Sequence, residues 1–290
     1  MSKVLDPKEQ GWFTLHRRDY FLRLKTALRW CLRHYLPRRK HAMPGRLVVS
    51  LTSYPPRFPT LARTLKTLLS QSIVPDVVVL WVAGNDFALL PEDVLALRGD
   101  GLAIETCADL RSYKKIIPAL EKWPEAFIAT ADDDSYYWRS WLDELVSEFH
   151  PSRREVLCHR AHKILLDENG GPVPYPAWTI DIECEPASEL IFPTGVGGVL
   201  YPPGALHRKT TNQGKFLALC PTADDVWLYF MAHLAGAKAR KVPSSKRVHS
   251  WLASQDVTLF SLNVGKGLND VQMTKMIQEF GFPGKLDRDL

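Results

Sequence analysis

Residues 127–137 (FIATADDDSYY) join a short apolar run directly to three adjacent acids, Asp132, Asp133 and Asp134. An apolar run of this length, bounded by polar residues, predicts a buried strand. In an open α/β sheet, ligands bind beyond the carboxyl ends of such strands, so the acids are expected at a ligand-binding edge. Adjacent carboxylates repel one another, and hard oxygen ligands suit Mg²⁺ or Mn²⁺, so a divalent cation is expected with them. The alternative is a solvated acidic turn that caps a helix beginning near Trp138.

Composition places the chain among ordinary globular proteins. Its 290 residues, 46% hydrophobic and 24% charged, are enough to bury a large core. The five cysteines are odd in number and form no CxxC pair, which argues against a disulfide framework and a structural zinc site and favours the reducing cytoplasm. The first ten residues are polar, and no apolar run approaches the ~20 residues that cross a bilayer, so neither a signal peptide nor a transmembrane helix is expected.

The positive charge is concentrated near the amino terminus. Residues 12–40 hold nine Lys or Arg against one acid, Asp19, whereas the chain as a whole carries +5. Basic residues lie between apolar residues that recur at helical spacing. The apolar positions are Phe21, Leu24, Leu28, Cys31, Leu32 and Tyr35. The pattern predicts a basic amphipathic helix on the anionic inner face of a membrane, and the alternative is a helix packed on the main domain. No nucleic-acid motif accompanies the charge, so nucleic acid is not an expected partner.

From residue 46 onward, predicted strands alternate with predicted helices, after a Pro-rich and basic linker at 37–45. The strands are expected at 46–52, 76–82, 102–106 and 127–132, and the helices at 61–69, 89–97 and 111–123. This alternation implies parallel βαβ units and a Rossmann-like nucleotide-binding half. No GxGxxG follows the first strand, so a dinucleotide cofactor is not expected.

Basic side chains follow two of these strands. Arg57 lies just after the first strand, and Arg111, Lys114 and Lys115 open the segment before the acidic strand. In a parallel sheet both turns lie at the edge that carries the acids, so these cations are expected to bind phosphates. The alternative for the two lysines is an exposed helix face.

Five segments, in this order, resemble bacterial family-2-like sugar transferases of polysaccharide and lipopolysaccharide assembly, which have the GT-A fold. They are residues 52–57 (TSYPPR), 111–115 (RSYKK), 131–134 (ADDD), 194–203 (TGVGGVLYPP) and 223–227 (ADDVW). The resemblance covers roughly residues 47–249. It implies an α/β fold with a mostly parallel sheet and a metal-dependent, inverting transfer of a sugar from a nucleotide-sugar donor to a glycan or lipid-linked acceptor.

The resemblance also implies a division of the chain. The basic helix and linker would occupy residues 1–45, and the GT-A catalytic domain residues 46–250. Within that domain, residues 46–137 would form the nucleotide-sugar half and residues 138–250 the acceptor half. Residues 251–290 would add a carboxyl-terminal loop and helix, and a loop at 263–272 could close over the donor.

By the same resemblance, Asp134 and Asp132 ligate the metal, Asp132 also faces the ribose, and Asp133 links them on the donor side. Thr52 and Tyr54 join the basic residues as donor-binding side chains. A late histidine, His249, would complete the metal site. The alternative is a structural histidine, because imidazole is a borderline ligand beside hard carboxylates.

Aromatic residues and glycines are expected on the acceptor side. Tyr175 and Trp178 could stack on a sugar, or they could pack beneath the proline-rich loop that holds them. Gly197 and Gly198 place bare backbone before a strand, where either a ligand or another strand approaches closely.

An acidic pair, Asp224 and Asp225, precedes an apolar helical run. One acid could cap that helix, but two exceed what a cap needs. Inverting transfer requires a carboxylate within hydrogen-bond reach of the acceptor hydroxyl, and the resemblance places this base in the pair, with Asp225 as the candidate. Two other classes stay open: a catalytically silent GT-A-like carbohydrate-binding or partner-binding module, and another metal-dependent nucleotide-using transferase. The oligomeric state is not indicated.

Overall fold

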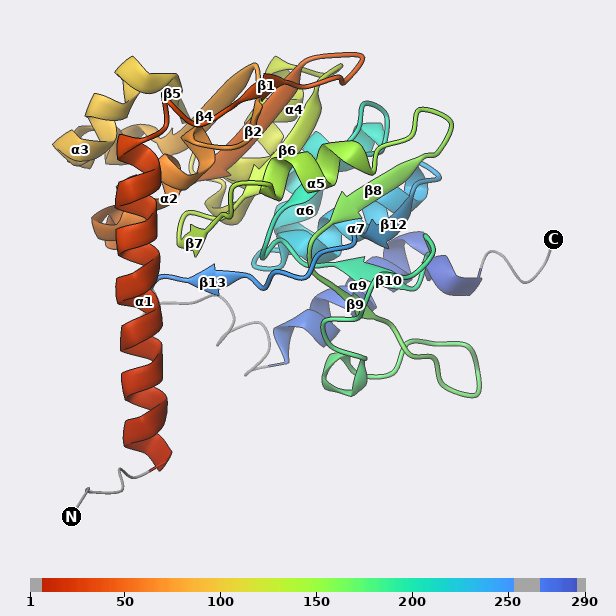
Figure 1. Cartoon of the computed structure of the whole chain (residues 1–290). Coiled ribbons are helices and arrows are strands. Elements are labelled where there is room, and N and C mark those ends of the chain that lie inside the picture. The colour runs from red at the N-terminus through yellow and green to blue at the C-terminus, as the bar shows by residue number, and fades with distance from the viewer. Residues whose placement is uncertain (1–6, 253–266, 286–290) are drawn as a thin grey trace.

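The computed structural model describes residues 7–252 and 267–285. Its main sheet consists of β2 (Leu47–Thr52), β4 (Val77–Ala83), β5 (Leu102–Cys107), β6 (Phe127–Ala131), β8 (Glu155–Cys158), β11 (Val199–Tyr201) and β12 (Lys238–Lys241). These seven strands lie in the order β12-β8-β11-β6-β2-β4-β5 (Figure 1). Strands β6, β2, β4 and β5 run parallel to one another, and β12 runs parallel to β8. Of these seven strands, β11 is the one that runs antiparallel to its neighbours. The α/β class with a mostly parallel sheet is therefore confirmed.

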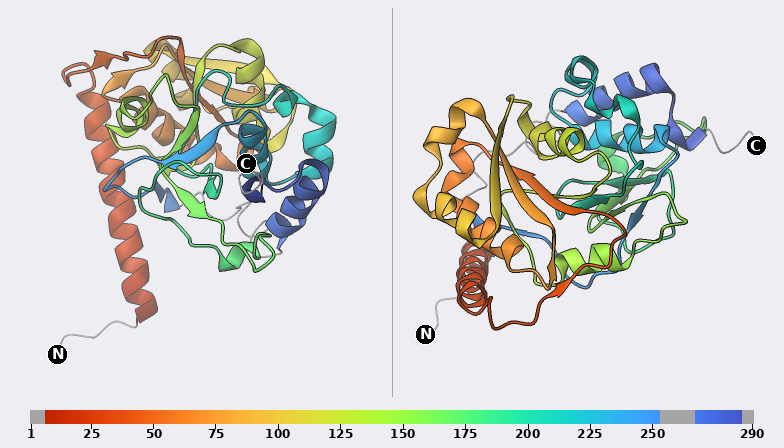
Figure 2. Two further views of the ribbon diagram at one scale, coloured as in Figure 1. Left: turned by 90° about the vertical axis from the view of Figure 1, so that its right-hand side faces the viewer. Right: turned by 90° about the horizontal axis from the view of Figure 1, so that it is seen from above.

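Two layers of helices cover the sheet (Figures 1 and 2). One layer contains α1 (Pro7–Cys31), α2 (Phe58–Leu69), α3 (Glu92–Leu95) and α5 (Trp141–Ser147). The other contains α4 (Ile117–Lys122), α6 (Gln213–Leu219), α7 (Asp224–Leu234) and α9 (Leu268–Phe280). Successive strand residues face opposite layers, so Val48 belongs to one core and Val49 to the other. Because both faces of the central strands are covered, β2, β4 and β6 are mostly apolar, whereas the edge strand β12 carries Lys238, Arg240 and Lys241.

Short strands pair outside the main sheet. They are β1 (Arg39–Lys40) with β3 (Ile73–Val74), β9 (Ala161–Lys163) with β10 (Ile191–Pro193), and β7 (Ser135–Tyr136) with β13 (His249–Ser250). Strand β1 lies inside the expected linker, and β3 lies after α2. The β7–β13 pair brings residues 249–250 beside the residues that follow the acids.

Two expected helices are shorter than the pattern predicted. The segment 111–123 is a 3₁₀ turn, η4 (Arg111–Lys115), followed by α4, because Pro118 fits only the first turn of a new helix. The segment 89–97 retains only α3, flanked by the 3₁₀ turns η2 (Gly84–Leu89) and η3 (Ala96–Asp100). The final helix α9 begins at Leu268, so residues 268–272 of the expected lid loop are helical, and residues 263–266 of that loop lie outside the described residues.

The remaining 3₁₀ turns are η1 (Pro55–Arg57), η5 (Tyr175–Ala177), η6 (Arg208–Thr211) and η8 (Pro283–Lys285). Helix α1 packs against α2. Its position is therefore the one given by the second expectation, a helix packed on the main domain. Among the described residues, no helix combines the length and apolar character needed to cross a bilayer.

Candidate active site

The acidic segment leaves the buried end of β6 and is held by three different parts of the fold. The bonds are Asp132 N–H to the Tyr137 hydroxyl (2.7 Å), the Thr64 hydroxyl to the Asp133 carbonyl (2.9 Å), and Trp251 N–H to the Asp134 carbonyl (2.8 Å). Backbone bonds of this kind fix where the three side chains point. The acids are therefore not a solvated helix cap.

Two of the acids take their partners from the first βα turn. The Asp134 carboxylate forms an ion pair with the Arg57 guanidinium, which comes from η1. The Ser53 hydroxyl donates to the Asp133 carboxylate. Burial nevertheless raises the pKa of Asp133 to about 6, with Asp134 adding to the increase. The turn after β2 thus faces the acids, as expected for neighbouring parallel strands.

Lys115 connects the acidic segment to the other half of the sheet. Its side chain is 9% exposed, and Nζ lies 3.5 Å from Asp132 Oδ1 and 3.0 Å from Asp224 Oδ2. Burial alone would lower the pKa of Lys115, but the nearby carboxylates hold it well above its usual value. The ammonium group is therefore charged and joins the end of β6 to the beginning of α7.

Asp225, the second residue of α7, adds a third carboxylate to this group. Burial, and then the charge of Asp224, raise the pKa of Asp225 to about 7, against the opposing effects of Lys115 and the Gly195 N–H. Neither acid caps α7 through its side chain; both lie in the first turn, where the helix dipole favours negative charge. We call Asp132, Asp224, Asp225 and Lys115 the acidic cluster.

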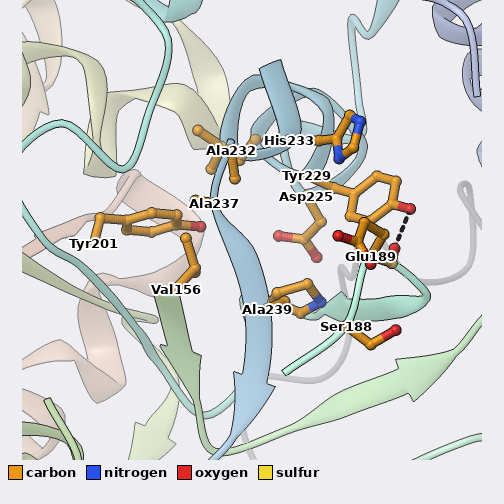
Figure 3. A pocket seen from close by; sticks show the side chains of 12 residues that line it. Val156, Ser188, Glu189, Tyr201, Asp225, Tyr229, Ala232, His233, Ala237 and Ala239 are labelled. Carbon is orange, nitrogen blue, oxygen red and sulfur yellow. Dashed lines mark hydrogen bonds between the residues drawn. The ribbon is translucent and has the colours of Figure 1, made fainter. Parts of the chain in front are cut away.

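The Asp225 carboxylate points into a small cavity (Figure 3). Tyr201 on β11, Tyr229 on α7 and Ala239 on β12 line this cavity with nine other residues. Its water-accessible volume is about 20 Å³, room for about one water molecule. Asp224 is buried instead, at 6% exposure, and is paired with Lys115. The two adjacent acids therefore have different surroundings.

The glycine-rich segment 194–203 contacts the acidic cluster through Gly195, and not through the expected Gly197 and Gly198. A Cβ on Gly198 would lie 2.5 Å from Trp141 Cζ2, and one on Gly197 would lie 2.6 Å from Val248 Cγ2. Both glycines have φ above +90°, so they make a tight turn against the protein's own side chains. A Cβ on Gly195 would instead lie 2.8 Å from Asp225 Oδ1. Gly197 and Gly198 are therefore packing residues, and Gly195 is the glycine at the acidic cluster.

These two roles are separable by substitution. Gly198→Ala is expected to lower the free energy of unfolding by ~1–3 kcal/mol, because alanine is strained at positive φ. Gly195→Ala is expected to cost less stability than Gly198→Ala, because its Cβ would meet the ends of two side chains, Lys115 Nζ (2.7 Å) and Asp225 Oδ1 (2.8 Å). It should lower activity by ~10-fold or more, because ~1 Å displacements at reacting groups are costly. Denaturant unfolding and turnover of both variants test this. The assignment of Gly198 to packing and Gly195 to the acidic cluster would be contradicted if the Gly195 variant were unfolded while the Gly198 variant kept normal turnover.

The remaining basic residues of the expected donor site have other partners. Lys114 forms an ion pair with Asp109 (2.8 Å), and Arg111 donates to the Pro221 carbonyl (2.9 Å). Of these three neighbouring basic residues, the structure thus places Lys115 in the acidic cluster. Thr52 donates to the Trp81 carbonyl and the Tyr54 side chain hydrogen-bonds to Arg57, so both lie in the turn that faces the acids.

The two aromatic candidates differ in accessibility. Trp178 is 4% exposed, packs at a tilt on Tyr175 and edge-to-face on Phe192, and donates its indole N–H to the Val173 carbonyl. It is a core residue, and its expected role in sugar stacking is corrected. Tyr175 is half-buried, and its pKa is raised to about 12 by burial and then by the charge of Asp225. Tyr175 therefore stays a candidate on the acceptor side.

His249 is not brought into the expected metal group. It lies on β13 opposite Tyr136, and its pKa is lowered by burial and by Arg18 and Arg247. Within residues 7–252 and 267–285 no three His, Cys, Asp or Glu side chains form a group that could hold a metal. In this pairing it is the backbone of Trp251, two residues beyond His249, that contacts Asp134.

A divalent cation nevertheless fits the acidic segment itself. The side chains of Asp132 and Asp134 are 21% and 15% exposed, so both are accessible. Mg²⁺ commonly binds through one or two carboxylates, with substrate phosphates and water completing its shell. Burial raises the pKa of Asp132 to about 7, and Asp134 adds to this, although Lys115 opposes it. Arg57 and Lys115 offset part of the charge of the three adjacent carboxylates, and a bound cation would further reduce their mutual repulsion.

Three contributors were not singled out from the sequence. Ser53 and Gly195 lie inside the TSYPPR and TGVGGVLYPP segments, but nothing in those patterns distinguishes them from their neighbours. The third is Tyr137, five residues after Asp132, whose hydroxyl accepts the Asp132 N–H. Each is identified only by its contact with an acid.

Comparisons with known proteins give likenesses of fold. Neither a protein-family model nor a curated protein matches the sequence. The structure of S. aureus TarS 1–349 in complex with UDP is similar, with a TM-score of 0.49 and 16% identity, covering 81% of this chain and 66% of that chain. GalNAc-T7 with UDP, GalNAc and Mn²⁺ has a TM-score of 0.42 and 11% identity, covering 85% and 57%. The inositol-1-phosphate CTP transferase from T. maritima has a TM-score of 0.38 and 15% identity, covering 83% and 97%. This chain thus spans less than two thirds of TarS and GalNAc-T7, which are glycosyltransferases of the GT-A fold.

Proposed function

We propose that the protein is a glycosyltransferase that uses a nucleotide-sugar donor. One observation carries the proposal: Lys115 brings Asp132, at the end of the nucleotide-side strand, together with the acidic pair of α7. A sugar transferase needs both groups, one beside the donor diphosphate and one beside the acceptor hydroxyl. A scaffold that only bound carbohydrate would have no need to bury three carboxylates around one lysine, since burying charge is costly.

In the proposed reaction, Asp225 is the general base. Its carboxylate takes the proton of the acceptor hydroxyl while that oxygen bonds to the anomeric carbon. The bond from the anomeric carbon to the donor phosphate oxygen breaks on the opposite side, so the configuration inverts and a nucleoside diphosphate leaves. Asp224 holds Lys115 beside the base, and Gly195 leaves room for its carboxylate.

On the donor side, Arg57 would stabilise the leaving diphosphate, together with Asp132 and Asp134 through the cation that they would hold. A divalent metal, Mn²⁺ or Mg²⁺, when bound there, would neutralise the negative charge that develops on the leaving group. Ser53 and Tyr54 keep the turn in position through Asp133 and Arg57.

We also propose where the enzyme works. The basic amino-terminal region favours the inner face of a membrane, with a glycan or lipid-linked acceptor of cell-surface polysaccharide synthesis. The number of protomers in the working enzyme does not enter this proposal.

The test is a panel of nucleotide sugars, each incubated with the full chain and Mn²⁺ or Mg²⁺. We expect slow release of nucleoside diphosphate from one donor, and its loss in excess chelator. Asp134→Asn should abolish both this release and the effect of metal on donor binding, because it removes an anionic ligand. Calorimetry of donor binding provides a readout independent of turnover.

Release that continues in excess chelator would refute metal dependence. Release of pyrophosphate from a nucleoside triphosphate would instead support a nucleotidyltransferase. Binding of a sugar with no turnover of any donor would favour the silent module.

A further inference from the structure

Helix α1 packs on the domain with a polar face. Its buried residues are Asp19, Leu22, Thr26 and Arg29, each 4–8% exposed. Arg29 Nη2 donates to the carbonyls of Thr67 (2.7 Å) and Tyr137 (3.0 Å), and Asp19 accepts the Leu252 N–H (3.1 Å). A surface helix usually buries its apolar stripe and exposes its charges. Here charged groups are used for docking, and the apolar stripe is left outside.

The opposite face of α1 carries that apolar stripe. Tyr20, Phe21, Leu24 and Leu28 are 64%, 62%, 51% and 62% exposed, and we call them the outer face. Tyr35, just beyond the helix, is 85% exposed. The helix runs along one side of the molecule, and its amino-terminal part projects beyond the body (Figures 1 and 2). A contiguous exposed apolar stripe of this kind marks an interaction surface.

Charge decides which partner fits the outer face. Arg17, Arg18 and Lys25 are exposed on the same helix, and the only acid in residues 12–40, Asp19, is buried and paired with Arg23. The region carries a net +8, so the rest of the chain is slightly acidic. A second copy would bring a second helix of the same charge against the first. An anionic bilayer instead offers headgroups for the cations and acyl chains for the apolar stripe.

We infer that the outer face of α1 docks on an anionic lipid bilayer while its inner face holds the catalytic domain in one orientation. The link to the site is short. Arg29 binds the Tyr137 carbonyl, and the Tyr137 hydroxyl accepts the Asp132 N–H. The helix is therefore part of the support of the acidic segment, and a docked helix would present that segment to the membrane at a fixed angle. The lipid-linked acceptor rests on the proposed function, whereas the docking itself does not.

Flotation of the full chain with vesicles tests the docking. Vesicles of equal parts phosphatidylcholine and phosphatidylglycerol should bind the protein at ~0.1 M salt and release it at ~1 M, as the Debye length falls from ~10 Å to ~3 Å. Phosphatidylcholine vesicles should bind it poorly. Leu24→Ser combined with Leu28→Ser should weaken binding by ~10-fold or more, since this removes the apolar part of the contact.

A matched control removes equally exposed apolar surface elsewhere. Ile180 and Val271 are 49% and 51% exposed, so Ile180→Ser with Val271→Ser should leave vesicle binding unchanged. Equal binding by the α1 variant and the native chain would overturn the inference. The inference would also be overturned if the native protein were a dimer in solution and the α1 variant were a monomer that still bound vesicles. Because flotation needs no donor or acceptor, its result is independent of the donor screen.

Discussion

Asp225→Asn is expected to lower kcat for sugar transfer by ~10²-fold or more and to leave donor affinity nearly unchanged. Asparagine has the same shape as aspartate but cannot take the proton of the acceptor hydroxyl. Asp225 neighbours Asp132 in the acidic cluster, but the expected diphosphate site is formed by Asp132, Asp134 and Arg57, so donor binding should change little. Single-turnover rates with saturating donor, compared with donor binding measured by calorimetry, separate the two effects.

The pH profile gives a second readout of the same residue. Burial and the Asp224 charge raise the pKa of Asp225 to about 7, so the base is protonated and inactive below that pH. The rate should therefore rise as pH increases through about 7 and level off above it. In Asp225→Asn this inflection in kcat should vanish. The pKa of Asp132 is also raised to about 7, so a dependence of donor binding on pH should remain.

Asp224→Asn is the neighbouring control. Asp224 is 6% exposed and pairs with Lys115. We therefore expect Asp224→Asn to lower the free energy of unfolding by more than it raises the activation free energy of turnover. If Asp224→Asn abolished turnover in a stable protein while Asp225→Asn kept it, the base would be Asp224.

The fold could be predicted largely from the sequence because its main signal is local. The apolar runs that become β2, β4, β5 and β6 are each bounded by polar or turn residues, and their alternation with helical patterns implies parallel pairing. The boundaries that differ, at 89–97 and 111–123, are places where prolines interrupt an apolar pattern. There the 3₁₀ turns depend on packing that periodicity does not contain.

The candidate site could be predicted only in part, because its details are contacts between distant segments. Lys114 and Lys115 are adjacent in the sequence, yet one pairs with Asp109 and the other enters the acidic cluster. Both side chains are buried, and which of the two faces the acids depends on the 3₁₀ geometry of η4. Likewise, Gly198 packs on Trp141, so the composition of the glycine run could not show that Gly195 faces Asp225.

The position of helix α1 could also be predicted only in part. Its apolar stripe was evident from spacing, but spacing does not tell which face a helix buries. The polar face is buried because Arg29 donates to two backbone carbonyls, those of Thr67 on α2 and Tyr137 after β7. Both residues lie far from Arg29 in the sequence. Removal of residues 1–45 would expose those carbonyls, so the helix is not a detachable tether.

Lys115→Met is expected to be the most destabilising single change in the acidic cluster, by ~3–5 kcal/mol at pH above 7. Lys115 is the buried cation shared by Asp132 and Asp224, with Asp225 beside them. Methionine has a similar length but no charge, so three carboxylates would face one another without compensation. Denaturant unfolding measures the loss, and turnover should fall because the pKa of the base rises further.

The sign of the pH dependence distinguishes this effect from a simple packing defect. The carboxylates of Asp132 and Asp225 have pKa values raised to about 7, so the folded state binds protons more tightly than the unfolded state. Stability should therefore fall as pH rises toward 7, and the penalty of Lys115→Met should shrink at pH values below 7. Adding Asp224→Asn to the variant should restore part of the stability by removing one buried charge. Lys114→Met is the comparison: the Lys114 side chain is only 4% exposed, but its partner Asp109 is 68% exposed and stays hydrated, so the change leaves no buried carboxylate without a partner. It should cost less than Lys115→Met, and equal losses for both lysines at every pH would show that the acidic cluster is not held by Lys115.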